Sequence, residues 1–130
     1  MRTINLPPPC CTLTVPDEHI QAAQDGVPIR YIGTTELGKL YFIACIDERP
    51  SALGGIEKFW LATPISHETM DAVLHHQIDL RTALCTSCTD EYYGFWIHDR
   101  KNGYRLSCNM RLWQIEEDKL PRSTLFWRGQ

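Results

Sequence analysis

The sequence lacks any apolar run close to the roughly 18–20 residues that a helix needs to cross a bilayer. Residues 1–11 contain one arginine and three prolines, without the apolar core of a secretory signal. Because of these two absences, the sequence predicts neither a membrane-spanning helix nor an N-terminal secretory signal. We therefore expect a cytoplasmic protein without a membrane partner.

Catalytic motifs are also missing. The sequence has no G-x-S-x-G, and Gly54-Gly55 is followed by neither a P-loop lysine nor a helix. Neighbouring acidic residues, such as Asp47-Glu48 and Asp90-Glu91, flank predicted turns, where solvated charge is the ordinary explanation. The sequence thus indicates a protein without chemistry of its own, although it does not exclude an enzyme.

A basic excess is absent as well, because the formal net charge is -3. Non-specific nucleic-acid binders usually carry a clear positive charge, so a role of that kind is disfavoured. The chain has 130 residues, 43% of them hydrophobic, which suits one globular domain. We expect residues 1–16 to form an extended, proline-rich lead-in and residues 17–130 to form a single domain.

Apolar patterning predicts the elements of that domain. A short helix is expected over residues 18–23, strands over residues 29–35, 40–46 and 57–63, and a helix from His67 to about His76. Asp79 is expected to cap a short helical turn over residues 80–84, and a hairpin over residues 92–115 follows. The order β-β-β-α-β-β predicts an α+β fold, with a twisted antiparallel sheet of five to six strands and one main helix packed on it.

Asn102-Gly103 predicts the tip of the last hairpin, since both positions of a two-residue hairpin turn need a positive φ. In that register Ile97 pairs with Cys108 and Phe95 with Met110. One face would then be apolar, with Phe95 and Met110 pointing into the core.

The other face of this hairpin carries aromatic and basic side chains of the kinds that dominate binding interfaces. Its members are Tyr92, Trp96, His98, Arg105, Asn109, Arg111 and Trp113. The favoured hypothesis is a small binding or regulatory module that acts through a partner protein, or by self-association, with this face. Two alternatives remain open: the face is the second packed side of the sheet, or it stacks bases and pairs phosphates as a nucleic-acid-binding accessory surface.

Cys85-Thr86-Ser87-Cys88 has the C-x-x-C spacing that suits a zinc knuckle or a redox pair. Zinc would need further ligands, and His75 or His76 at the end of the predicted helix could supply them. The alternative explanation places those histidines where a cation meets the negative end of the helix dipole. We expect no cofactor, reduced thiols for the six cysteines, and a zinc-stabilised domain as the alternative.

Three segments between Leu40 and Leu84 carry a family resemblance. They are the strand that ends in Asp47, the strand that closes in Pro-Ile-Ser at residues 64–66, and the Ile-Asp-Leu-Arg-Thr-Ala-Leu stretch at residues 78–84. In these segments the chain resembles a family of small uncharacterised bacterial α+β domains. The resemblance implies a bacterial or mobile-element origin, and it implies no activity. Arg81 in this stretch is expected to stay solvated or to pair with an acidic strand end such as Asp47 or Glu48.

Overall fold

A computed structural model describes residues 1–8, 10–85, 91–98, 108–122 and 125–127. Within these residues, eight strands form one antiparallel sheet in the order β1-β2-β4-β5-β6-β7-β8, and β3 pairs with β4 beside this path. The strands are β1 Arg2–Asn5, β2 Thr12–Val15, β3 Ile20–Gln24, β4 Val27–Thr34, β5 Leu40–Pro50, β6 Ile56–Ile65, β7 Tyr92–His98 and β8 Cys108–Met110. The helices are α1 His67–Leu74 and α2 Leu80–Cys85, with 3-10 turns η1 Asp17–His19, η2 Leu112–Gln114 and η3 Glu117–Lys119.

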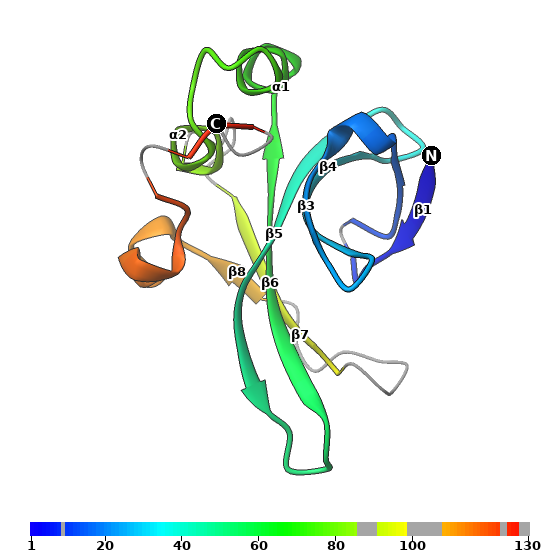
Figure 1. Ribbon diagram of the computed structural model, residues 1–130, viewed down its shortest axis with the longest axis vertical. Coiled ribbons are helices and arrows are strands. Elements are labelled where there is room, and N and C mark those ends of the chain that lie inside the picture. Colours follow the sequence, from blue (N-terminus) through cyan, green and yellow to red (C-terminus); the bar gives the residue numbers. More distant parts are fainter. Residues whose placement is uncertain (9, 86–90, 99–107, 123–124, 128–130) are drawn as a thin grey trace.

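The predicted α+β fold is wrong, because the sheet dominates the structure and curls into an open half-barrel (Figure 1). Its two α-helices have only eight and six residues. The difference arises at the N-terminal end, where residues 2–24 contribute three strands in place of a lead-in and a helix. Neither of the two described α-helices is long and apolar enough to span a membrane.

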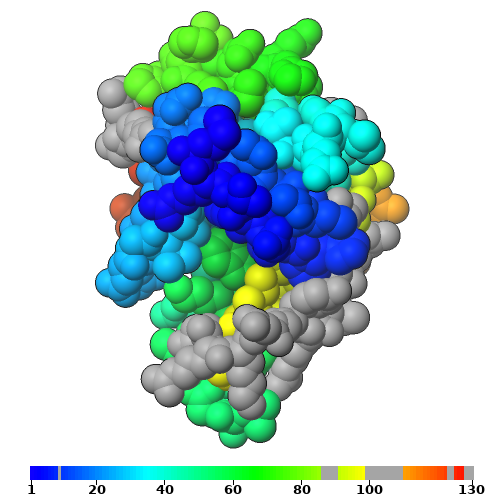
Figure 2. Space-filling model, turned by 90° about the vertical axis from the view of Figure 1, so that its right-hand side faces the viewer, coloured from blue at the N-terminus to red at the C-terminus, as the bar shows by residue number. Residues whose placement is uncertain are grey.

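Within the predicted lead-in, residues 2–5 and 12–15 form a hairpin of the sheet. β1 and β2 pair antiparallel, with Arg2 opposite Val15, and β2 joins β4 at the pair Thr14–Thr34. Leu13 and Val15 are completely buried, while their neighbours Thr12 and Thr14 are exposed, which is the alternation of a half-buried strand. Figure 2 shows this hairpin in dark blue, lying across one face of the molecule.

The predicted helix over residues 18–23 is also wrong. A single 3-10 turn at Asp17–His19 leads directly into β3, which pairs with β4 from Ile20–Tyr31 to Gln24–Val27. Asp25 and Gly26 connect the two strands with φ values of 51° and 79°. Asp-Gly with both φ values positive is the favoured two-residue hairpin turn, and it fixes residues 20–24 as a strand.

The central strands and the helices follow the sequence prediction more closely. β5 and β6 include the expected segments 40–46 and 57–63, and β4 covers residues 29–34 of the expected 29–35. β5 is buried on both faces from Leu40 through Ala44. Ser66 caps α1 by accepting a hydrogen bond from the backbone nitrogen of Thr69 at 3.1 Å. Asp79 accepts one from the backbone nitrogen of Thr82 at 2.6 Å, so the predicted cap of the second short helix is confirmed.

The predicted register of the last hairpin is wrong by three residues. Met110 pairs with Tyr92 and not with Phe95, and Cys108 pairs with Gly94 and not with Ile97. An odd shift exchanges the faces of β8, since side chains alternate along a strand. Met110 therefore shares a face with Tyr92 and Trp96, whereas Phe95 points to the opposite side. The predicted tip at residues 102–103 lies outside the described residues.

The sheet separates two apolar clusters. The cluster on the helix side includes Phe42, Leu61 and Tyr92, and it is covered by α1, α2 and the C-terminal residues Ile115 and Trp127. The cluster on the hairpin side is enclosed by the β1–β2 hairpin. It consists of Cys10, Leu13, Val15, Tyr31, Tyr41, Ile43, Trp60, Ala62 and Phe95. Both faces of the central strands are thus packed.

Candidate functional site

The longest hairpin of the sheet, β5–β6, extends beyond the packed body (Figure 1). A register shift between Cys45 and Asp47 leaves Ile46 as an extra residue, which is a β-bulge. Beyond the bulge, Asp47 pairs with Phe59, and Phe59 pairs in turn with Trp96 of β7. The bulge therefore sets which side chains of β5 share a face with Trp96.

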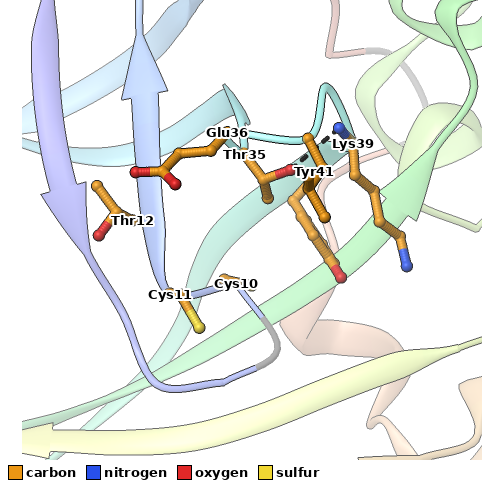
Figure 3. Close-up of a pocket in the computed structure, with 8 residues that line it drawn as sticks. Cys10, Cys11, Thr12, Thr35, Glu36, Lys39 and Tyr41 are labelled. Carbon is orange, nitrogen blue, oxygen red and sulfur yellow. Dashed lines mark hydrogen bonds between the residues drawn. The ribbon is translucent and has the colours of Figure 1, made fainter.

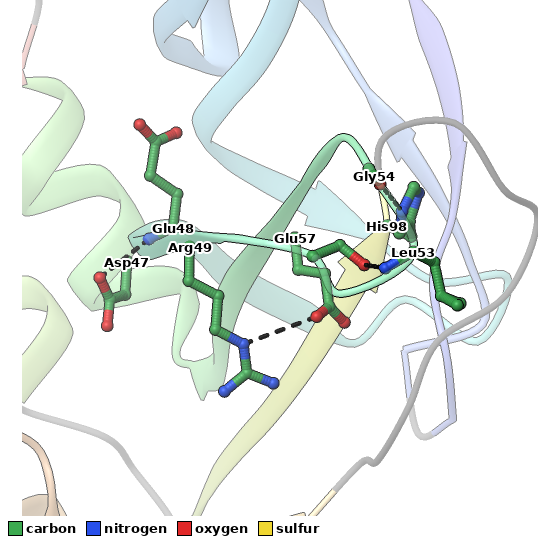
Figure 4. A network of polar contacts seen from close by, with 8 residues as sticks. Asp47, Glu48, Arg49, Leu53, Gly54, Glu57 and His98 are labelled. Carbon is green, nitrogen blue, oxygen red and sulfur yellow. Dashed lines mark hydrogen bonds and ion pairs between the residues drawn. The ribbon is translucent and has the colours of Figure 1, made fainter.

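A second row of the same face carries the charged residues Arg49 and Glu57, with His98 of β7 paired to Glu57 (Figure 4). Arg49 pairs with Glu57 across the strands, and its Nε lies 3.6 Å from the Glu57 Oε1 atom, in a carboxylate that is almost completely buried. The Arg49 guanidinium lies 3.9 Å from the centre of the Trp96 ring. On β7, His98 Nε2 donates to the carbonyl oxygen of Gly54 at 2.7 Å. These contacts fix the face and orient the Trp96 ring.

Trp96 and Phe59 form one wall of an open groove. Their ring centres are 5.1 Å apart and tilted by 51°. The groove has a volume of about 210 Å³ and is lined by Ile46, Asp47, Phe59, Trp96, Met110, Gln114, Ile115, Glu116 and Lys119. We call this the Trp96 groove. Its floor and walls are mainly aromatic and aliphatic, and its charged side chains come from the residues after β8 and from the bulge.

An ion pair closes one end of the Trp96 groove. Lys119 Nζ lies 3.3 Å from Asp47 Oδ1, and this hydrogen bond raises the pKa of the lysine. The pair ties η3 to the β5 bulge. Arg81, expected to pair with Asp47 or Glu48 or to stay solvated, instead donates to Glu117 at 2.8 Å. That expectation is wrong because η3 brings its own carboxylate closer to α2.

The predicted contact face is only partly assembled. Tyr92 is buried and donates its hydroxyl to the Leu84 carbonyl oxygen at 3.0 Å. Trp96 is half-buried in the groove wall, and the half-buried His98 bonds to the hairpin tip. The C-terminal members lie differently: Arg111 is exposed at the start of η2, and Trp113 on η2 is 81% exposed.

The β7–β8 register determines the position of Asn109, another member of that face. Asn109 pairs with Tyr93, the residue after Tyr92, whereas Tyr92 pairs with Met110. Arg105 lies outside the described residues. Among the described members of the predicted face, Trp96 lines the groove, and Trp113 lies on η2 next to the groove-lining residue Gln114.

The predicted zinc ligands are described only in part, because Cys88 lies outside the described residues. His75 ends α1, where its Nδ1 donates to the Asp71 carbonyl oxygen at 2.8 Å. His76 follows with a φ of 61°. Burial raises the pKa of the Cys85 thiol, which favours the protonated form. Among the described residues, no three or more His, Cys, Asp or Glu side chains are grouped to hold a metal ion.

A second cavity of about 420 Å³ lies between the β1–β2 connection and the β4–β5 turn (Figure 3). Cys10 at its base is buried, and burial raises the pKa of its thiol to about 12, so it stays protonated at neutral pH. Thr35 Oγ1 accepts a hydrogen bond from the Lys39 backbone nitrogen at 3.0 Å, which closes the turn. Cys11, Glu36 and Lys39 are exposed at the rim. The cavity contains no activated thiol at its base.

Sequence reasoning missed Phe59, Asp47 and Arg49, which build the groove with Trp96. Side chains alternate between the two faces of a strand, so Glu57, Phe59 and Leu61 share one face. This alternation could have indicated that Phe59 belongs to the face of the groove. The position of these residues opposite Trp96 depends on the β6–β7 register and on the bulge at Ile46, and the sequence shows neither.

No protein-family model, no curated protein and no solved structure matches this chain. The family resemblance of residues 40–84 therefore stays a prediction. The geometry of the chain's own residues carries the functional argument.

Proposed function

We propose that this chain is a small binding module that recognises another protein through the Trp96 groove. The observation that carries the proposal is the fixed aromatic wall: Trp96 contacts both Arg49 and Phe59 and still borders a groove open to solvent. Tryptophan and arginine are enriched at binding hot spots, because they supply large contact areas at a limited entropy cost. A wall fixed before binding reduces that cost further.

The size of the groove suggests its occupant. Small-molecule sites usually have volumes of about 300–1,000 Å³, whereas a cavity of about 150 Å³ holds one benzene. At about 210 Å³, the groove suits a single aromatic or large aliphatic side chain. The proposed partner is therefore a protein segment that inserts one apolar anchor residue.

The charges of the groove favour a protein over a nucleic acid. Lys119 is paired with Asp47, and Arg49 with Glu57, so the cations beside the aromatic wall already have acidic partners. Phosphate binding depends on cations that can pair with the backbone of the nucleic acid. The formal net charge of -3 points in the same direction.

Selection of peptides from a random displayed library tests the proposal. We expect the selected peptides to share one aromatic or large aliphatic residue. Trp96→Ala should weaken their binding by roughly tenfold or more, because Trp96 forms the wall of the groove. The same substitution should lower the free energy of unfolding by about 1–3 kcal/mol and leave the chain folded, because Trp96 is only half-buried. Fluorescence titration and urea denaturation measure the two effects.

Leu53→Ala is the matched control, since Leu53 is also apolar but lies exposed at the tip of the β5–β6 hairpin. It should leave peptide binding unchanged. Light scattering determines whether the occupant is a second copy of the chain: a dimer that Trp96→Ala dissociates would assign the groove to self-association. Peptides that bind Trp96→Ala and Met110→Ala as tightly as the natural chain would refute the groove as the contact site.

A further inference from the structure

A third cavity, of about 400 Å³, lies next to the Trp96 groove, and Ile46 and Lys119 line both. It is bounded by β4 and β5 on one side and by residues 118–122 and Leu125 on the other. Three cationic side chains, Arg30, Lys119 and Arg122, line this cavity. We call it the basic cavity.

The positive charges of the basic cavity are only partly compensated. Lys119 is paired with Asp47, and Asp118 is the single acidic residue of the lining. Within the described part of the chain, the guanidinium groups of Arg30 and Arg122 make no hydrogen bond or ion pair. At the Trp96 groove, by contrast, both cations have acidic partners: Lys119 pairs with Asp47, and Arg49 pairs with Glu57.

Arg30 is unusual because it is half-buried in the middle of β4, opposite Ala44. Burial lowers the pKa of its guanidinium, which nevertheless stays charged at neutral pH. A half-buried charge without a counter-ion is costly, and an anion beside it would offset that cost. A guanidinium also offers paired donors that match the oxygens of a carboxylate or phosphate group.

We propose that the basic cavity binds a small organic oxyanion, a ligand that places a carboxylate or a phosphate group between Arg30 and Arg122. Its volume falls in the range of small-molecule sites, so it accommodates more than a lone inorganic ion. The inference does not depend on the proposed protein contact, because the ligand is different and neither Arg30 nor Arg122 lines the Trp96 groove.

Thermal unfolding and calorimetric titration test this site with two probes, inorganic phosphate and succinate, each compared with sodium chloride at equal ionic strength. At least one probe should raise the melting temperature of the natural chain in a saturable way. Arg30→Met and Arg122→Gln should each weaken that binding by roughly tenfold or more. Tighter phosphate binding assigns a phosphorylated ligand, and tighter succinate binding assigns a carboxylate ligand.

Lys39→Gln, which removes an exposed cation at the cavity beside Cys10, is the matched control and should bind as the natural chain does. Without anion, Arg30→Met should melt no lower than the natural chain, since it removes an unpaired charge. A structural role for Arg30 would instead lower the melting temperature with or without anion. Equal responses of the natural chain and Arg30→Met, or no saturable response, overturn the proposal. If Arg30→Met does not fold, Arg122→Gln provides the same comparison.

Discussion

Phe95→Ala is expected to lower the free energy of unfolding by about 3–5 kcal/mol, the usual cost of truncating a buried phenylalanine. Phe95 is completely buried and packs in the hairpin-side cluster with Leu13 and Trp60. The cavity left by truncation would lie between β7 and the β1–β2 hairpin, where close packing limits collapse. Urea denaturation followed by tryptophan fluorescence measures the change.

Leu37→Ala is the control for this experiment, because Leu37 is 98% exposed and its loss should cost less than about 0.5 kcal/mol. A cost below about 1 kcal/mol for Phe95→Ala would mean that the N-terminal hairpin does not cover β7. That result would contradict the closed, curled sheet.

Gly94→Val is expected to destabilise the fold by about 3 kcal/mol or more, at the upper end of overpacking effects. A Cβ at Gly94 would meet Phe59 Cζ and lie 2.6 Å from Met110 Sδ, so both side chains would have to move. Phe59 and Met110 line the Trp96 groove, and their displacement should also abolish peptide binding. Denaturation and peptide titration of the same sample follow both effects.

Gly94→Ala provides the graded comparison, since it adds only the Cβ atom. It should be less destabilising than Gly94→Val and should weaken peptide binding less. A valine variant as stable as the natural chain would show that Phe59 and Met110 do not close over Gly94.

The elements set by local signals could be predicted from the sequence. Asp79 caps α2 as expected, and Ser66 caps α1 in the same way, because each cap depends only on a residue three positions away. The apolar run at residues 40–46 is buried on both faces through Ile43 and lies in the centre of the sheet. In these cases the local signal and the tertiary fold agree.

The Asp25-Gly26 turn could also have been predicted. It carries the same type of hairpin signal as Asn102-Gly103, yet residues 18–23 were interpreted as a helix. Gln21, Ala22 and Ala23 have no strong preference for strands, so composition alone favoured the wrong element. The two-residue turn and its pairing with β4 determine the outcome.

The candidate site could not be predicted in the same way, because it depends on register. The bulge at Ile46 places Asp47 opposite Phe59, which pairs in turn with Trp96. The β7–β8 register differs by three residues from the predicted one, and it places Met110 on the same face. Bulges and offsets are set by packing across the whole sheet. Trp96, which the sequence pattern predicts as a contact residue, lines the groove, but the sequence does not identify its neighbours there.

The central claim is that Met110 lies with Phe59 and Trp96 on the groove side of the sheet, and the most direct test is nuclear magnetic resonance of the methionine methyl groups. With the methyl carbons labelled, the Met110 resonance is assigned by comparison with Met110→Leu. We predict nuclear Overhauser contacts from the Met110 methyl group to the Phe59 ring, because both side chains meet at Gly94. Contacts from Met110 to the Phe95 ring, without contacts to Phe59, would contradict the register and the groove built on it.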